Sequence, residues 1–261
     1  MRRHVRSRHR HPRRAAFSIR RKTNNPLADI STVYLPYCDG GLFASDADVD
    51  SDDDGMVDRY HRGIHNLSAA LDVAVQTFPA PNRIVLAGVS GGGYGTIFAM
   101  PLVRQLYPDI PIEVINDSGV GITRPDDEAF NQQIIDYWNI GGFFPDSCSE
   151  CVVQGDPTEF LDWQLQQDPD MRLGMLSYSQ DSTIGGFFLG IGGPTFEQIL
   201  RTAMAELEAR NPDRMRSFIR AGDSHTFLLG DLSVSVQNVS VSEWVESMLD
   251  DVEGNWQSVS E

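Results

Sequence analysis

Short apolar runs alternate with longer segments whose apolar residues recur at helical spacing. Five runs contain β-branched or aromatic residues and predict strands: Thr32–Tyr37, Ile84–Ala87, Pro111–Asn116, Arg172–Ser179 and Met215–Ala221. Helical spacing marks four other segments: His61–Gln76, Thr96–Met100, Thr195–Arg210 and Val241–Leu249. This alternation predicts an α/β fold of the α/β-hydrolase type, with a mostly parallel sheet and helices on both faces. The run Ile84–Ala87 is typical of a strand buried on both faces.

The stretch Gly88-Val89-Ser90-Gly91-Gly92 follows this last strand directly and leads into a helix. It matches G-x-S-x-G, in which a tight turn presents a nucleophilic serine and flanking glycines let strand and helix pass without a Cβ clash. The backbone N–H of Gly91 lies where an oxyanion would develop. The alternatives are a phosphate loop, against which the absence of G-K-[ST] argues, and a glycine-rich turn with an idle serine.

Candidate partners of Ser90 follow later strands. Asp181 comes after the strand Arg172–Ser179, and His225 comes after the last strand. The order Ser, Asp, His at one sheet edge predicts a triad in which His225 is the base and Asp181 orients it. Asp223 is an alternative acid, and a loop histidine without a catalytic role is the alternative for His225.

Other polar residues are also predicted at this edge, where ligands of open α/β sheets bind. Asp39 and Gly40 follow the first predicted strand, while Asp117 and Ser118 follow the strand Pro111–Asn116. We expect these four residues to form walls of a substrate pocket. Structural turns are the alternative for both pairs.

The chain has 261 residues and a net charge of −16, and its basic residues are unevenly distributed. Residues 1–22 contain ten of the 21 basic residues and no acidic one, which predicts a disordered basic arm before a single domain over 23–261. The acidic body argues against nucleic acid as a partner, and no apolar run is long enough to span a membrane. Residues 121–165 are irregular and rich in aromatics, as expected for a substrate-covering cap or for core helices with long loops.

An acidic stretch precedes the first predicted helix. Asp50, Asp52, Asp54 and Asp58 match positions one, three, five and nine of a calcium loop, whereas position twelve is His61 rather than Glu. The spacing predicts a structural Ca²⁺ site, with a solvated acidic loop as the alternative.

The three cysteines are Cys38, Cys148 and Cys151. The C-x-x-C pair has neither a second pair nor nearby histidines, which argues against zinc. We expect a local disulfide between Cys148 and Cys151 in an exported protein, with Cys38 left unpaired.

Several of these motifs together resemble the pectin acetylesterase and Notum-type carboxylesterase family, especially its bacterial members. The motifs are Tyr37-Cys38-Asp39-Gly40, the Ser90 turn extended to Gly93, Asn116-Asp117-Ser118-Gly119, the strand into Asp181, and Asp223-Ser224-His225. The resemblance implies a serine esterase with Ser90, Asp181 and His225 as triad, no cofactor for catalysis, and an extracellular or periplasmic location. It also implies an ester substrate, since members remove acetyl groups from polysaccharides or acyl groups from proteins.

The chain departs from the family pattern before Tyr37. The family has a strand that ends in a glycine triplet there and supplies oxyanion-hole N–H groups, whereas this chain has the basic arm. The chain is therefore expected to be truncated or altered at this end, with fewer oxyanion donors and an exposed sheet edge.

We therefore expect an esterase that hydrolyses a carboxylic ester, in particular an acetyl ester of a carbohydrate, through an acyl-Ser90 intermediate. One alternative is a deacylase for longer acyl chains, with Phe143, Phe144, Phe187 and Phe188 lining an acyl pocket rather than packing in the core. The other is a non-catalytic, calcium-stabilised remnant.

Overall fold

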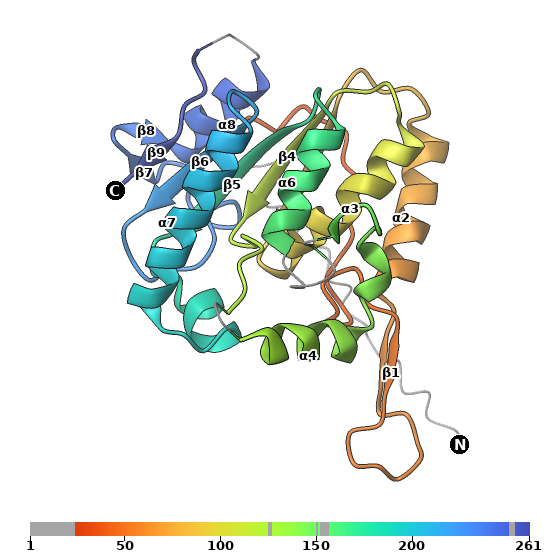
Figure 1. Ribbon diagram of the computed structural model, residues 1–261. Coiled ribbons are helices and arrows are strands. Elements are labelled where there is room, and N and C mark those ends of the chain that lie inside the picture. Colours follow the sequence, from red (N-terminus) through yellow and green to blue (C-terminus); the bar gives the residue numbers. More distant parts are fainter. Residues whose placement is uncertain (1–23, 125–126, 150, 152–156, 251–253) are drawn as a thin grey trace, which may run out of the picture.

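The computed structural model describes residues 24–124, 127–149, 151, 157–250 and 254–261, so the basic arm over 1–22 lies outside the described residues. The central sheet is parallel throughout, in the order β3-β4-β5-β6-β9 (Figure 1). Its strands are β3 (Ile84–Val89), β4 (Ile112–Asp117), β5 (Arg172–Tyr178), β6 (Met215–Arg220) and β9 (Val259–Ser260). Two antiparallel hairpins accompany it, β1 (Ala47–Val49) with β2 (Arg59–His61), and β7 (Ser235–Val236) with β8 (Val239–Ser240).

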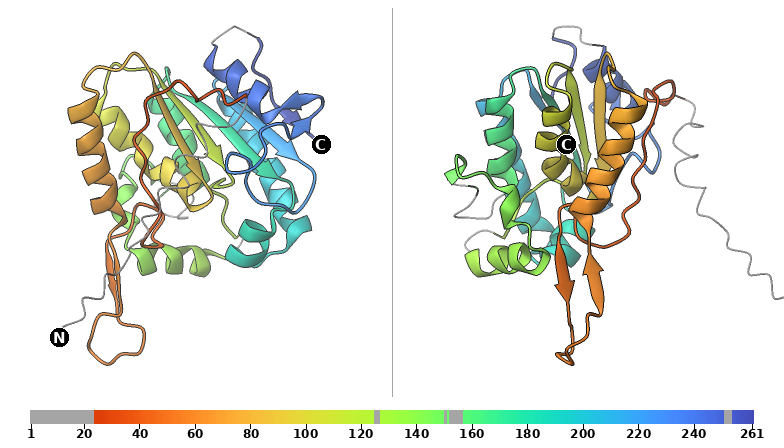
Figure 2. Two further views of the ribbon diagram at one scale, coloured as in Figure 1. Left: turned by 180° about the vertical axis from the view of Figure 1, so that it is seen from behind. Right: turned by 90° about the vertical axis from the view of Figure 1, so that its right-hand side faces the viewer.

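Helices cover both faces of the sheet, as predicted (Figure 2). The helical elements are α2 (Gly63–Thr77), α3 (Gly91–Leu106), α4 (Glu128–Trp138), η1 (Gly141–Phe143), α6 (Pro157–Gln167), the π-helix η2 (Ser182–Phe188), α7 (Gly193–Arg210) and α8 (Val241–Leu249). Successive residues of a strand point to opposite faces, so Val114 joins the core under α3, α6 and α7, whereas Ile115 joins the core under α8.

Two predictions about the first strands are wrong. Residues 31–38 form no regular strand, and Val33, Tyr34 and Tyr37 on this segment are exposed. Pro36 has no N–H to give to a sheet. β3 is a strand, but its residues are only half-buried or exposed, because β4 is the one described strand that pairs with it. Among the described strands, β3 is therefore an edge strand of the sheet.

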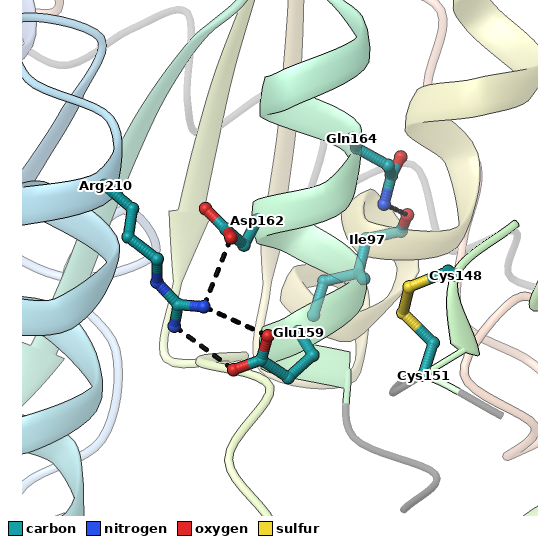
Figure 3. Close-up of a disulfide and its surroundings, with 7 residues drawn as sticks. All are labelled: Ile97, Cys148, Cys151, Glu159, Asp162, Gln164 and Arg210. Atoms are coloured by element: carbon teal, nitrogen blue, oxygen red, sulfur yellow. Dashed lines mark hydrogen bonds and ion pairs between the residues drawn. A yellow bond between two sulfur atoms is a disulfide. The ribbon is translucent and has the colours of Figure 1, made fainter. Parts of the chain in front are cut away.

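The aromatic region over 121–165 contributes helices to the body of the fold. α6 packs against α3 and α7, and its residues Phe160, Leu161 and Leu165 are buried. Gln164 Nε2 donates to the Ile97 carbonyl at 3.1 Å, and Arg210 binds Glu159 and Asp162 (Figure 3). These contacts favour core helices over a cap for α6.

The predicted disulfide joins Cys148 to Cys151 beside this layer (Figure 3). Cys38 is free and exposed. Within the described ranges, no helix combines the length and apolarity that a membrane crossing requires.

Candidate active site

Ser90 lies in a tight turn between β3 and α3, at the carboxyl edge of the sheet. Its backbone has φ 58° and ψ −120°, a conformation that non-glycine residues rarely adopt and that persists only where the surroundings impose it. The Ser90 N–H donates to the Asp117 carbonyl at 2.7 Å. A Cβ on Gly88 would lie 1.9 Å from the Gly92 carbonyl oxygen, so this turn requires glycine at position 88.

The structure brings the three predicted triad residues together in one hydrogen-bonded chain. His225 Nε2 lies 2.8 Å from Ser90 Oγ, and His225 Nδ1 lies 2.7 Å from Asp181 Oδ2. Asp181 is fully buried, and its Oδ1 accepts from the N–H groups of Thr183 and Ile184 at the start of η2. With Nδ1–H donating to this carboxylate, Nε2 is left to accept the Ser90 proton.

The alternative acid, Asp223, lies outside this chain of contacts. Asp223 is exposed, and its backbone carbonyl accepts from Ser182 N at 3.1 Å. Asp117 and Ser118 were predicted as pocket walls, but both are fully buried and bind the backbone after His225. The structural turn considered for this pair agrees with these contacts, because the loop after β6 folds back over the turn after β4. A substrate contact of either residue stays a prediction. Burial raises the pKa of Asp117 to about 6, against the opposing effect of its hydrogen bonds from Leu228 and Phe227.

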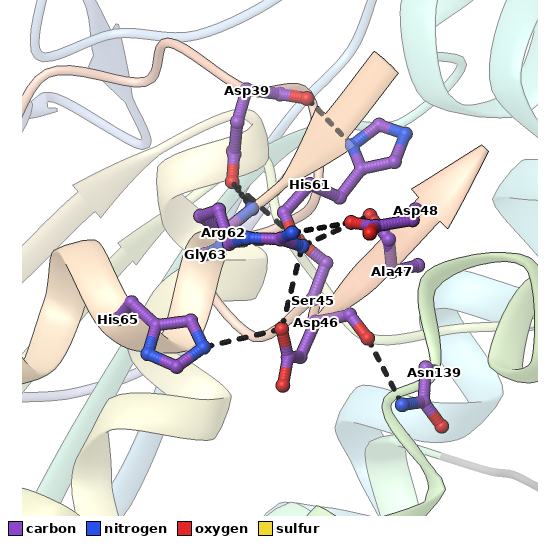
Figure 4. Close-up of polar contacts among 10 residues, drawn as sticks. All are labelled: Asp39, Ser45, Asp46, Ala47, Asp48, His61, Arg62, Gly63, His65 and Asn139. Atoms are coloured by element: carbon purple, nitrogen blue, oxygen red, sulfur yellow. Dashed lines mark hydrogen bonds and ion pairs between the residues drawn. The ribbon is translucent and has the colours of Figure 1, made fainter. Parts of the chain in front are cut away.

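Asp39 binds backbone groups near its own turn and at the start of α2 (Figure 4). Its carboxylate accepts from the N–H groups of Arg62 at 2.8 Å and Gly41 at 3.1 Å, while its carbonyl lies 2.7 Å from His61 Nδ1. Gly40 beside it is exposed, at φ 73°. The structural turn considered for this pair agrees with these contacts, and a substrate contact of either residue stays a prediction.

Two aromatic side chains beside the Ser90 turn were not predicted. Tyr37 and Phe43 stack at 5.0 Å between ring centroids and cover the first turns of α3. A Cβ on Gly91 would approach the Tyr37 ring to 2.7 Å, and one on Gly95 would approach Phe43 to 2.5 Å. The glycines at positions 91, 92, 93 and 95 were the sequence signal for this close approach.

Three of the four predicted calcium ligands lie together in the loop between β1 and β2. Carboxylate oxygens of Asp50, Asp52 and Asp58 lie within 4.8 Å of one another. Asp54 is outside this group, and its Oδ1 accepts from Met56 N at 2.8 Å. Oxygen ligands of this kind suit Ca²⁺. Calcium binding stays a prediction.

The four phenylalanines proposed for an acyl pocket have separate surroundings. Phe143 and Phe144 pack edge-on against Phe98, whereas Phe188 contacts Tyr94 and Trp138. Phe187 is 88% exposed. An apolar cavity lined by Tyr94, Phe98, Phe144 and Phe188 has a volume of about 30 Å³, which has room for only one or two water molecules.

The fold is similar to that of a solved structure, the Wnt deacylase Notum from Drosophila. The two chains share 15% sequence identity with a TM-score of 0.60, over 87% of this chain and 70% of the Notum chain. The likeness supports an α/β-hydrolase fold of the Notum type. A search of the curated proteins found no match.

A family model matches the chain as well. The Pectinacetylesterase model covers residues 6–145, so the match begins within the basic arm and includes Ser90, but ends before Asp181 and His225. The matched residues make up more than half of the 261, and the protein therefore belongs to the Pectinacetylesterase family.

Proposed function

We propose that this protein is a serine carboxylesterase that hydrolyses an acetyl ester of a carbohydrate through an acyl-Ser90 intermediate. The observation that carries the proposal is the chain of contacts from Asp181 through His225 to Ser90, at 2.7 Å and 2.8 Å. Membership of the Pectinacetylesterase family supports the reaction class.

In the proposed acylation step, Ser90 Oγ attacks the ester carbonyl carbon while its proton passes to His225 Nε2. The negative charge then develops on the carbonyl oxygen, where the Gly91 N–H and the N-terminus of α3 stabilise it. The buried Asp181 carboxylate stabilises the imidazolium. When the tetrahedral intermediate collapses, the C–O bond to the alcohol breaks and His225 returns the proton to the leaving oxygen.

In the proposed deacylation step, a water molecule takes the place of the alcohol. His225 Nε2 removes a proton from this water as the water oxygen attacks the acyl carbon. The same proton then passes to Ser90 Oγ as the bond between the acyl carbon and Ser90 Oγ breaks. The products are the carboxylic acid and the free enzyme. This chemistry needs no cofactor.

A small acyl group is favoured over a long one. The apolar cavity near the start of α3 is too small for a fatty acyl chain without movement of its aromatic walls. Of the four phenylalanines considered for an acyl pocket, only Phe187 is exposed and so available to contact a longer acyl chain. Its exposure favours the alternative, a deacylase for longer chains. Export from the cytoplasm is part of the proposal, and the Cys148–Cys151 disulfide supports it.

The test is hydrolysis of p-nitrophenyl acetate by the purified protein and by Ser90→Ala, with a fluorophosphonate probe that labels activated serines. We expect activity and labelling in the natural protein, and a loss of at least about 10³-fold in kcat for the variant. Rates on acetate, butyrate and octanoate esters then compare acyl lengths, and we expect acetate to be the best substrate.

Each outcome separates the alternatives. A preference for octanoate would replace the acetylesterase by the longer-chain deacylase. A folded protein with neither hydrolysis nor labelling would contradict both enzymes and leave the non-catalytic protein.

A further inference from the structure

The turn after β4 lies between the turns that hold Ser90 and Asp181, because β4 pairs with β3 on one side and β5 on the other. Its backbone is tied to both neighbours. The Asp117 carbonyl accepts from Ser90 N at 2.7 Å, and Ser118 N donates to the Leu176 carbonyl at 2.8 Å. The turn is thus fixed relative to the nucleophile.

The side chains of the same turn bind the loop that carries His225. Asp117 Oδ2 accepts from Phe227 N at 2.8 Å and Leu228 N at 2.7 Å. Ser118 Oγ accepts from Thr226 N at 3.2 Å and donates to Asp117 Oδ1 at the same distance. Three consecutive backbone amides directly after His225 are therefore held by two adjacent side chains.

The loop is also anchored on its apolar side. Phe227 is buried, stacks on Tyr178 at 4.3 Å between ring centroids, and meets Phe218 edge-on at 5.6 Å. The hydrogen bond from its backbone N–H to Asp117 Oδ2 and its ring contacts fix the loop at a position two residues beyond His225.

This arrangement is costly to the fold. A fully buried carboxylate loses its hydration, and both Ser118 at φ 61° and Thr226 at φ 66° lie in the left-handed region. Such features persist where the surroundings determine them and are concentrated at functional sites. Here the buried carboxylate and the two strained residues lie together where the turn after β4 binds the loop that follows His225.

We propose that Asp117 and Ser118 are positioning residues for His225, which hold its loop at the distance from Ser90 that proton transfer requires. The inference rests on the proposed esterase function. Asp117 does not touch Ser90 Oγ or the imidazole in hydrogen-bonding contact, and acts through the backbone of residues 226–228.

The ionisation of Asp117 gives this role a pH signature. The titratable groups that face it are His225 on the loop and Tyr178 at the end of β5. β3 contributes no charged residue, and Glu113 on β4 is held by Arg83 and Arg172. A carboxylate accepts stronger hydrogen bonds than a neutral acceptor, so protonation of Asp117 below its pKa of about 6 weakens its hydrogen bonds from Phe227 N and Leu228 N. We call these two hydrogen bonds, with that from Thr226 N to Ser118 Oγ, the clamp.

The experiment compares D117N with the natural protein in p-nitrophenyl acetate hydrolysis, with kcat expressed per fluorophosphonate-labelled site. At about pH 8 we expect kcat to fall about 10-fold with KM within about 2-fold, because a displaced base slows the chemical step. The ratio of the two kcat values should approach one towards about pH 5, because both side chains are then neutral.

Two further variants control for folding. Asp168→Asn removes a carboxylate that binds Arg104 Nε at 2.6 Å on a different part of the chain, so we expect a lower melting temperature with kcat per labelled site unchanged. Ser118→Ala keeps the Asp117 carboxylate and removes the bond to Thr226, and we expect kcat to fall about 3-fold with KM unchanged. This second variant tests the proposal if D117N does not fold.

Equal kcat per labelled site in D117N and the natural protein, or a ratio that does not change with pH, would overturn the proposal. Amide hydrogen exchange tests it without enzyme activity. We expect faster exchange at Thr226–Leu228 in D117N and no change at the amides of β5. If the natural protein hydrolyses no ester but D117N shows this faster local exchange, the esterase proposal fails, whereas the hydrogen-bonding role of Asp117 in the loop remains. If exchange at Thr226–Leu228 is the same in both proteins, that role is contradicted as well.

Discussion

Gly88 and Gly92 flank Ser90 symmetrically in the sequence, but they have different surroundings in the structure. A Cβ on Gly88 would meet the Gly92 carbonyl oxygen at 1.9 Å and Thr96 Cγ2 at 2.7 Å. A Cβ on Gly92 would find its nearest contact at 3.8 Å, an ordinary distance to Phe43. The motif predicted that glycine is needed at both positions to avoid a clash. In the structure only Gly88 is needed for this reason, because the Gly92 carbonyl lies directly beside its Cα.

We therefore expect opposite results from two matched alanine substitutions. Gly88→Ala should lower the free energy of unfolding by at least about 2 kcal/mol, since backbone atoms must move to admit the Cβ. Gly92→Ala should change it by less than about 1 kcal/mol, as alanine has the better helix propensity. Urea unfolding measures both. A Gly88→Ala protein as stable as the natural one would mean that the turn has more room than its geometry indicates.

At the scale of elements, local signals explain which predictions succeeded. α8 has its predicted bounds, Val241–Leu249, because Ser240 and Glu243 form a capping box at its start. η2 was missed, since its π-helical form has no apolar periodicity and its first amides are held by Asp181. The segment over Thr32–Tyr37 has strand-like residues but no strand partner among those described.

The hairpin of β1 and β2 projects from the body and carries the predicted calcium loop (Figures 1 and 2). A cation between Asp50, Asp52 and Asp58 would relieve the repulsion of their carboxylates. We expect the melting temperature of chelated protein to rise by about 3 °C in about 10 mM CaCl₂, by mass action on the folded state.

Asp52→Asn is the matched control for this measurement, since it removes one charge from the group and should abolish the rise. Equal concentrations of MgCl₂ should have a smaller effect, because Mg²⁺ requires a more regular shell at shorter distances. A melting temperature that does not respond to Ca²⁺ would leave the solvated acidic loop as the explanation of the spacing.

For the whole molecule, the distribution of charge matters more than the net value. Residues 23–261 contain 11 basic and 37 acidic residues, so the folded body repels itself. Part of this charge is neutralised locally, as where Glu113 lies between Arg83 and Arg172, but most acidic side chains are at the surface.

Salt should consequently stabilise the protein by screening. Between about 10 mM and about 200 mM NaCl we expect the melting temperature to rise by several degrees, with most of the change below about 100 mM, where the Debye length shortens to about 10 Å. KCl should give the same curve, which distinguishes screening from specific ion binding. A melting temperature that falls with salt would show that attractive ion pairs outweigh the repulsion.

The sequence by itself determined the α/β alternation, the Ser90 turn and the local disulfide, because each depends on residues close in the chain. It also determined the order of the three candidate catalytic residues, because each follows a predicted strand. It favoured Asp181 over Asp223 as the partner of His225, but it could not show that Asp117, predicted as a pocket wall, would bind the backbone after His225. Strand order and register decided this: they carry Asp181 to the imidazole and place Asp117 under the loop behind it. The half-buried state of β3 was likewise decided by its neighbours in the sheet, because burial depends on what packs against a strand and not on its own composition.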